Sequence, residues 1–495
     1  MNYGAIAWAL APEAILALTA LAVLGMDAAL ARRWSVPVRW RAAVAAGVAG
    51  CLGALVWMAA ADPPGRLAGG MLVLDDASRF VCQALAVLTM ASLVLSIETA
   101  LTEHIGEYVA LMLLATVGLM LMAGAENMVL VYASLELASL SLYALAAFQR
   151  ESRHGLEAAL KYFLLGGMSS AFLLYGMSAL YGLSGEVELS RMAPKLARLG
   201  MDPLLIVALA SVVVGLGFKV AVVPFHLWAP DVYQAAPLPT AALVASGSKM
   251  ASFYLLIRFM LEGFPELAGR ADWRGWEGGW MPLLGMAAAL SIGLGNLVAL
   301  VQSSVRRLLA YSAIAHAGYA LLGVMAGNAE GTAAVVYYLS TYALAVIGAF
   351  GVAGIVERNS GGDRLENFAG LWQRSPLLAA CLFVFILSLA GLPPLAGFVG
   401  KFAVFAAAAG AGGGGLGLIW LIAWALGMSA VSLYYYLQVL KQAYVREAEA
   451  GRGSSAAWRV LPATRVVLLG LAVAVVLLGC FPGGVLSWLR AALGS

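Results

Sequence analysis

The sequence has little charge. Only 11% of its 495 residues are charged, whereas 63% are hydrophobic and the mean hydropathy is +0.91. An average soluble domain carries about 25% charged residues and could not bury this much apolar surface. The net charge of +3 is spread along the chain and forms no basic cluster of the kind that binds nucleic acid. The composition therefore indicates a polytopic membrane protein in a lipid bilayer, with no nucleic-acid partner.

Cysteine is also scarce, and the recognisable cofactor motifs are missing. The four cysteines lie far apart in apolar runs, without a CxxC pair or a Cys/His spacing typical of zinc or iron–sulfur sites. No glycine-rich phosphate loop opens a soluble βαβ unit. We therefore expect neither a metal site nor a cofactor site in this chain. The N-terminal stretch MNYGAIAWALAPEAIL lacks a basic region and predicts a first membrane helix, not a cleaved signal.

Long apolar runs fill most of the chain. A bilayer-spanning helix needs about 20 mostly apolar residues. Fourteen runs meet this requirement and predict an all-α fold, with spans at 7–28, 39–60, 78–99, 108–124, 126–148, 156–184, 202–223, 237–262, 281–301, 304–325, 333–356, 376–408, 413–440 and 463–485. The low-complexity stretch 406–417 predicts a bend between the last two long runs of the second half.

Loop charge predicts the orientation of these spans. The connections after odd-numbered helices hold sixteen Lys and Arg residues, whereas the other side holds eight. Because the side richer in Lys and Arg faces the cytoplasm, both termini are expected on the outer side of the membrane.

Two predicted spans contain helix breakers. Pro224 follows Lys219 in the seventh span, and Pro393-Pro394 precede Lys401 in the twelfth. Proline removes a backbone donor and clashes with the preceding turn, so both helices should break. The two breaks are five helices apart, an odd number, so the broken helices should run in opposite directions. This pattern predicts two inverted five-helix repeats, at 108–262 and 281–440, after an N-terminal segment 1–107 and before a C-terminal segment 441–495.

Ionisable residues inside the spans are the functional candidates, because a charge at bilayer depth costs at least about 2.5 kcal/mol. The first group is Glu136, Lys219 and His226. Lys219 and His226 are seven residues apart, about two helical turns and nearly one face. The structural alternatives are a neutral hydrogen-bonded Glu136, a Lys219 that extends to the cytoplasmic surface, and a His226 that is a polar plug near the surface.

The second group is Lys249, Lys401, Lys161, His316 and Arg258. Lys249 and Lys401 lie too deep to reach the surface easily. Lys161 follows Glu157 by four residues, which is also the spacing of an ordinary helical ion pair. His316 is a relay candidate or a satisfied core histidine, and Arg258 is expected to extend to the outer surface.

Five segments resemble, in order, the antiporter-like subunits of respiratory complex I. They are SLELASLSLYALAAF, EAALKYFLLGGMSSAFLLYG, GLGFKVAVVPFHLWAPDVYQAAPLPTAALVASGSKMASF, GNLVALVQSSVRRLLAYSAIAHAGY and SLAGLPPLAGFVGKF. The resemblance covers nearly the whole chain. The residues around Glu136 and Lys161 and the stretch FHLWAPDVYQAAP are most similar to subunit N, the bacterial counterpart of mitochondrial subunit 2.

The resemblance implies one proton channel assembled from the two repeats. Matched by motif, Glu136 pairs with Lys219, Lys249 is the central lysine, and Lys401 lies towards the exit. His226 and His316 match the polar axis between them, with Lys161 as a further relay candidate. The sequence departs from the family at Arg306, where lysine is common. Because arginine is effectively never deprotonated, this position is expected to be a fixed charge or an anchor on the cytoplasmic side.

The resemblance also implies the surroundings. The expected function is proton translocation by an NADH-quinone oxidoreductase in the bacterial inner membrane, with other antiporter-like and small helical subunits as partners. NAD, FMN, iron–sulfur clusters and quinone would belong to partner subunits. The alternatives are an Mrp-type cation/proton antiporter, which sodium dependence would favour, the membrane arm of a related hydrogenase, and a non-transporting scaffold.

Overall fold

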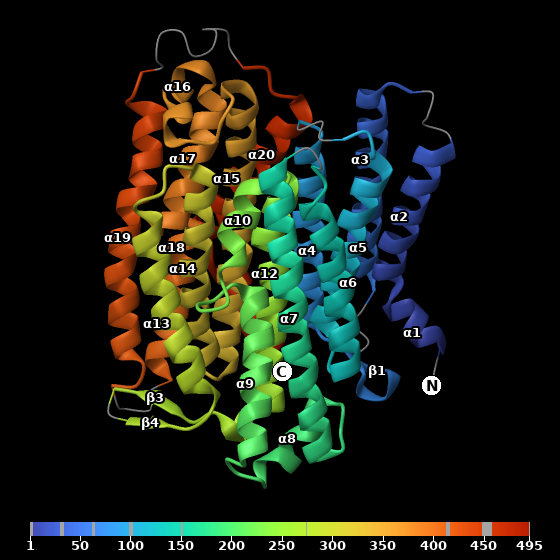
Figure 1. Ribbon diagram of the computed structural model, residues 1–495, viewed down its shortest axis with the longest axis vertical. Coiled ribbons are helices and arrows are strands. Elements are labelled where there is room, and N and C mark those ends of the chain that lie inside the picture. The colour runs from blue at the N-terminus through green and yellow to red at the C-terminus, as the bar shows by residue number, and fades with distance from the viewer. Residues whose placement is uncertain are drawn as a thin grey trace.

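The computed structural model describes residues 3–29, 34–61, 65–98, 102–149, 152–273, 275–411, 416–447 and 458–494. Five of the counted loop arginines, Arg32, Arg33, Arg150, Arg274 and Arg452, lie outside the described residues, as do residues 412–415 of the predicted bend. The helices stand side by side in one bundle (Figure 1).

The first part of the bundle contains short and long helices. They are α1 (Tyr3–Ala9), α2 (Ala11–Ala29), α3 (Val36–Ala60), α4 (Asp76–Ser96), α5 (Ile105–Gly124), α6 (Met128–Ala146), α7 (Arg153–Ser184), α8 (Leu189–Ala197), α9 (Pro203–Val220), α10 (Trp228–Ala235), α11 (Leu238–Leu243) and α12 (Lys249–Arg258). Two π-helical turns, η3 (Val244–Ser248) and η4 (Phe259–Gly263), extend α11 and α12 into one continuous span.

The second part continues with α13 (Trp280–Ala299), α14 (Val305–Met325), α15 (Ala329–Ser360), α16 (Leu371–Arg374), α17 (Pro376–Ala390), α18 (Ala396–Gly410), α19 (Ile419–Tyr444), α20 (Pro462–Cys480) and α21 (Gly483–Gly494). Two small antiparallel hairpins, β1 (Gly65–Leu67) with β2 (Leu72–Leu74) and β3 (Arg270–Asp272) with β4 (Gly275–Glu277), cap the lower end in Figure 1.

The span count agrees with the sequence. In the described part of the chain, thirteen helices are long and apolar enough to cross a membrane, and α17 and α18 are two shorter apolar helices. The thirteen helices and the α17–α18 pair match the fourteen predicted spans. The predicted polytopic all-α fold is therefore confirmed.

The seventh span was predicted too short. It was expected to end at residue 223, but α9 ends at Val220 and a second piece, α10, continues to Ala235. Both pieces pack along the 32-residue helix α7. The 32-residue helix α15 is packed in the same way against α17 and α18. Lys219 therefore lies in the middle of a broken span, not near the end of a complete one.

The two breaks have the same backbone ending. Ala221 and Gly391 end α9 and α17 in the left-handed conformation, with φ of 57° and 84°. The next amides, of Val222 and Leu392, donate to the carbonyls of Gly217 and Leu387. This pairing is the Schellman ending of a helix. In Figure 1, α10 lies above α9 whereas α18 lies below α17, so the broken spans run in opposite directions, as an inverted repeat requires.

Candidate functional site: a buried chain of lysines

Lys219, in the last turn of α9, is held by two side chains of α6. Its ammonium group donates to the Ser139 hydroxyl at 2.6 Å and to the Tyr143 hydroxyl at 3.1 Å. The Lys219 nitrogen also lies 5.4 Å from the centre of the Tyr143 ring. The residue is only 8% exposed, so the alternative that Lys219 extends to the surface is wrong. The polar groups of α6 satisfy the ammonium inside the protein.

Glu136 lies one turn before Ser139 on the same face of α6. Its carboxylate accepts a hydrogen bond of 2.5 Å from the Ser170 hydroxyl on α7. Among the described residues, Glu136 forms no ion pair with Lys219. The direct contact implied by the family resemblance is therefore not formed here, because Lys219 binds the polar groups one and two turns further along α6.

Gly166 on α7 makes room for the Tyr143 side chain. A Cβ atom at Gly166 would lie only 1.9 Å from the Tyr143 hydroxyl oxygen, whereas a Cβ at the adjacent Gly167 would meet nothing within 4 Å. The glycine therefore allows the hydroxyl to sit where Lys219 can donate to it. Replacing Gly166 with alanine adds one methyl group and leaves the rest of the backbone unchanged, so this substitution tests the contact directly.

We expect Gly166→Ala to push the Tyr143 hydroxyl away from Lys219. If the chain translocates protons, as the family resemblance implies, the rate should fall by about tenfold to a hundredfold, because small misplacements of a reacting group are costly. Gly167→Ala is the matched control and should keep the wild-type rate. Proton uptake by vesicles containing each variant measures the difference. Equal rates in the two variants would show that Tyr143 has no part in the path.

His226 lies inside the break, beyond the end of α9. The predicted alignment of Lys219 and His226 on one helical face is wrong, because helical periodicity stops at Ala221. His226 is buried, and its Nδ1 atom has no hydrogen-bond partner among the described residues. Close by, the Val223 amide donates to the Ser291 hydroxyl of α13 at 2.9 Å, which ties the break to the second half of the bundle.

Lys249 begins α12, directly after the π-helical turn η3. It is 1% exposed, and its ammonium group donates to the Ala313 carbonyl of α14 at 2.5 Å. The Lys249 nitrogen lies 5.9 Å from the centre of the Tyr342 ring of α15. Because α14 belongs to the predicted second repeat, Lys249 connects the two halves of the chain.

His316 lies on α14, three residues beyond Ala313. Its Nδ1 atom is 2.5 Å from the Tyr338 hydroxyl of α15, and its Nε2 atom is 3.1 Å from the Tyr436 hydroxyl of α19. Tyr436 is also hydrogen-bonded to the Ser312 hydroxyl. His316 is therefore the centre of a buried hydroxyl–imidazole chain that joins three helices.

Lys401 lies on α18, just after the second break. It donates to the Ala390 carbonyl at the end of α17 and to the Ser429 hydroxyl of α19, each at 3.0 Å. Its ammonium group lies 5.1 Å from the centre of the Tyr319 ring. A helix end freed by the break thus supplies one of its partners, as expected for irregular backbone at membrane depth.

Lys161 differs from the buried lysines, because its side chain is 46% exposed. The helical ion pair with Glu157 forms at 2.8 Å, and a second pair with Asp231 of α10 forms at 3.0 Å. Asp231 also pairs with Arg307 at 2.9 Å. These groups line a polar cavity of about 430 Å³ at the end of the bundle predicted to face the cytoplasm. The structure therefore places Lys161 at a solvent-accessible mouth, outside the buried chain.

Two buried arginines are fully paired. Arg306 donates to the carbonyls of Tyr233 and Ala236, which end α10, and pairs with Glu357 at 3.1 Å. It thus anchors α10, the second piece of the broken seventh span. Arg258 is 4% exposed and pairs with Glu262 at 3.1 Å. The expectation that Arg258 extends to the surface is therefore wrong, because a carboxylate one turn away holds it inside.

The partner groups of the lysines, of Glu136 and of His316 were missed from the sequence. They are Ser139, Tyr143, Ser170, Tyr338, Tyr436, Ser429 and, at the cavity mouth, Asp231. Serine and tyrosine are common in membrane helices, and only packing shows which of them face a lysine. For Asp231, a signal was present: an acidic residue in the otherwise apolar stretch FHLWAPDVYQAAP.

Known proteins share this architecture. Residues 125–427 match the family described as "NADH:quinone oxidoreductase/Mrp antiporter, TM". The chain is 47% identical over 489 residues to NADH-quinone oxidoreductase subunit N 2 of Acidobacterium capsulatum, covering 97% of both chains.

Two solved structures have a similar fold. A chain of respiratory complex I from Thermus thermophilus, with bound aureothin, is 35% identical with a TM-score of 0.77, covering 96% of this chain and 98% of that one. A chain of the Mrp complex from Dietzia sp. DQ12-45-1b has a TM-score of 0.81 at 22% identity, covering 100% of this chain and 97% of that one, which shows a shared fold alone.

Proposed function

Because this chain belongs to the NADH:quinone oxidoreductase/Mrp antiporter transmembrane family, we propose that it is the N-type membrane subunit of an NADH-quinone oxidoreductase and translocates protons. The buried series Lys219, Lys249 and Lys401, each donating to neutral oxygen atoms, carries this proposal. A lysine held by hydroxyl and carbonyl groups has no carboxylate that fixes its charge, so it can both hold and release a proton.

The chemistry of the path follows from these contacts. A negative charge on Glu136 stabilises the ammonium form of Lys219 by Coulomb attraction, which is strong in a medium of low dielectric constant. When Glu136 becomes neutral, Lys219 releases its proton more readily. Ser139 and Tyr143 are the first groups able to pass that proton on. Such coupled sites gain and lose protons as a set, not as independent groups.

Further along the proposed proton path, His316 provides a group that can accept one hydrogen bond and donate another at the same time. Its two ring nitrogens contact hydroxyl groups on α15 and α19, and a neutral imidazole has one donor and one acceptor nitrogen. Lys249 donates to a carbonyl one helical turn before His316 on α14. Lys401 then lies beside the second break, where freed backbone groups provide polar partners.

The orientation of the protein in the membrane is part of the same proposal. The end with the polar Lys161–Asp231 cavity would face the cytoplasm, and the end with the two hairpins would face the outside of the inner membrane. The excess of loop cations supports this assignment. Both chain ends lie in the lower half of Figure 1, consistent with an even number of spans. NAD, FMN, iron–sulfur clusters and quinone would bind to partner subunits.

Purification of the tagged chain in mild detergent tests the proposal. We expect it to bring other membrane subunits, flavin and iron–sulfur protein with it, and to show NADH:quinone reductase activity. Recovery of the chain only with other membrane subunits, together with sodium-dependent proton exchange, would instead identify an Mrp-type antiporter. The identity of 35% to the complex I chain against 22% to the Mrp chain favours the first result.

A further inference from the structure

A small pocket lies far from the lysine chain, between the first helices of the bundle. Its lining comes from four helices and one strand: Trp8 and Ala9 of α1, Pro12 and Glu13 of α2, Trp57 and Met58 of α3 with Ala61 just after it, Leu74 of β2, and Arg79 and Cys82 of α4. These elements meet at the end of the bundle that carries the β1–β2 hairpin (Figure 1). None of these residues belongs to the proposed proton path.

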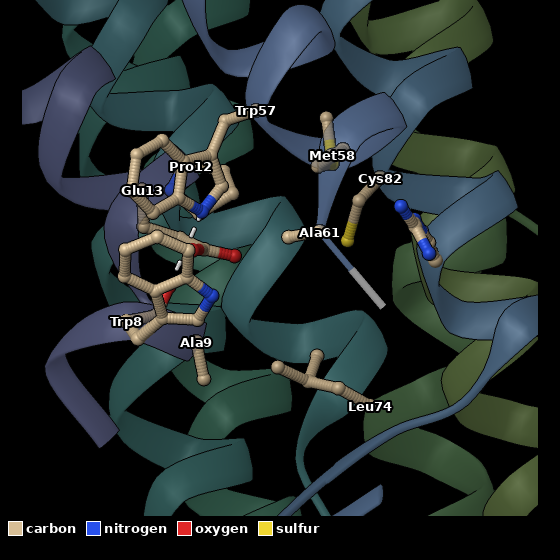
Figure 2. Close-up of a pocket in the computed structure, with 10 residues that line it drawn as sticks. Trp8, Ala9, Pro12, Glu13, Trp57, Met58, Ala61, Leu74 and Cys82 are labelled. Atoms are coloured by element: carbon tan, nitrogen blue, oxygen red, sulfur yellow. Dashed lines mark hydrogen bonds between the residues drawn. The ribbon is translucent and has the colours of Figure 1, made fainter. Parts of the chain in front are cut away.

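Glu13 is the unusual member of this lining. The residue is 7% exposed, and its Oε2 atom has no hydrogen-bond partner among the described residues. In Figure 2 its carboxyl group lies beside the labelled rings of Trp8 and Trp57 and points towards the space bordered by Ala61, Leu74 and Cys82. A buried carboxyl oxygen without a partner costs about 1–3 kcal/mol, so the pocket is suited to a ligand that donates hydrogen bonds.

The two indole rings favour a cation as the ligand of this pocket. Their centroids are 4.3 Å apart, and the Trp57 ring nitrogen donates to the Trp8 carbonyl at 3.3 Å, which fixes the pair. Indole faces attract ammonium groups, and tryptophans gather where the bilayer meets water. The described residues contain no cluster of three or more His, Cys, Asp or Glu, so a bare metal ion would find too few ligands here. An organic ammonium needs only the carboxylate and the rings.

The volume of the cavity limits which ammonium groups could bind. The cavity volume is about 50 Å³, whereas a cavity of about 150 Å³ holds benzene. The pocket therefore suits a primary ammonium group better than a trimethylammonium group or a quinone ring. Arg79 lines the same pocket and forms no ion pair with any described residue, so it can meet a phosphate. Carboxylate, indoles and guanidinium together complement a zwitterionic head group.

We propose that this pocket binds the head group of phosphatidylethanolamine, with Glu13 as the acceptor for its ammonium group and Arg79 as the partner of its phosphate. The lipid would join α1 and α2 to α3 and α4 at the membrane surface. The site is independent of the proton path, so a negative result for the lipid site would leave the proposed function unaffected.

Native mass spectrometry of the full-length chain tests this site. The delipidated protein is offered equal amounts of dioleoyl phosphatidylethanolamine and dioleoyl phosphatidylcholine, which differ only in the head group. We expect wild type to prefer the ethanolamine lipid and Glu13→Gln to lose about tenfold in its affinity, the value of one hydrogen bond to a charged group. Glu107→Gln removes an exposed carboxylate from α5 and should keep the wild-type preference.

Trp57→Leu is the second variant. It keeps the carboxyl group, removes an indole face from the rim, and should also weaken the preference, so the test does not depend on the folding of Glu13→Gln alone. Equal binding of the two lipids by wild type, or an unchanged preference in Glu13→Gln, would show that Glu13 is only a neutral buried carboxyl. Binding of free ethanolamine that depends on Glu13, without any preference between the lipids, would overturn the lipid assignment.

Discussion

Lys219→Met is expected to lower proton translocation by about a hundredfold, the lower limit of what a positioned proton-transfer group contributes. The apolar side chain fills nearly the same space but cannot carry a proton from the α6 hydroxyl groups. Lys219→Arg should fail as severely, because arginine keeps its positive charge at every working pH. Proton uptake by proteoliposomes, driven by NADH and quinone, measures both variants.

The arginine variant separates two roles of the residue. If Lys219 is only a fixed charge that holds α6 and α9 together, Lys219→Arg should pump at nearly the wild-type rate. Lys441→Met, which removes an exposed lysine from the last turn of α19, controls for the loss of a positive charge. Wild-type pumping by Lys219→Met would remove this residue from the path altogether.

Gly397→Ala is expected to destabilise the protein by about 3 kcal/mol or more. Gly397 lies in the first turn of α18, and a Cβ atom there would lie 1.8 Å from the backbone carbonyl oxygen of Ser388. Backbone cannot move aside as a flexible side chain can, so overpacking must be absorbed by separating α17 from α18. Because Lys401 lies one turn further along α18, its contacts with Ala390 and Ser429 should loosen as well.

A glycine in an open position provides the control for Gly397. Gly427 lies inside α19, and a Cβ atom there would meet nothing within 4 Å. Gly427→Ala should therefore be neutral or stabilise the protein by about 0.5–1 kcal/mol, the usual gain for alanine in a helix. Thermal unfolding in detergent compares the two. A Gly397→Ala variant as stable as Gly427→Ala would contradict the close packing at the second break.

The sequence predicted the membrane spans well, since the length of an apolar run reflects bilayer thickness directly. It did not predict α10, because the short stretch WAPDVYQA is too polar to count as part of a span. Proline positions indicated where the spans break, yet the direction after each break depends on packing against α7 and α15. The inverted repeat stays a prediction, supported by the matching helix endings at Ala221 and Gly391.

The candidate site was predicted in part. Buried lysines stand out in an apolar sequence, because such charges are costly without a role. Their partners do not stand out, and the resemblance alone suggested a direct Glu136–Lys219 pair where the structure has Ser170 and Ser139 as the respective partners. Glu13 was overlooked because its position near the start of α2 resembles an ordinary first turn of a helix.

The number of protons translocated per NADH oxidised, measured in proteoliposomes for wild type and Lys249→Arg, tests the central claim most directly. Lys249 is the most deeply buried lysine and contacts both halves of the chain. Arginine retains the charge and prevents proton release. If protons pass through this residue, the ratio should fall while the complex stays assembled. An unchanged ratio in an assembled complex would show that the buried lysines hold the helices together and do not carry protons.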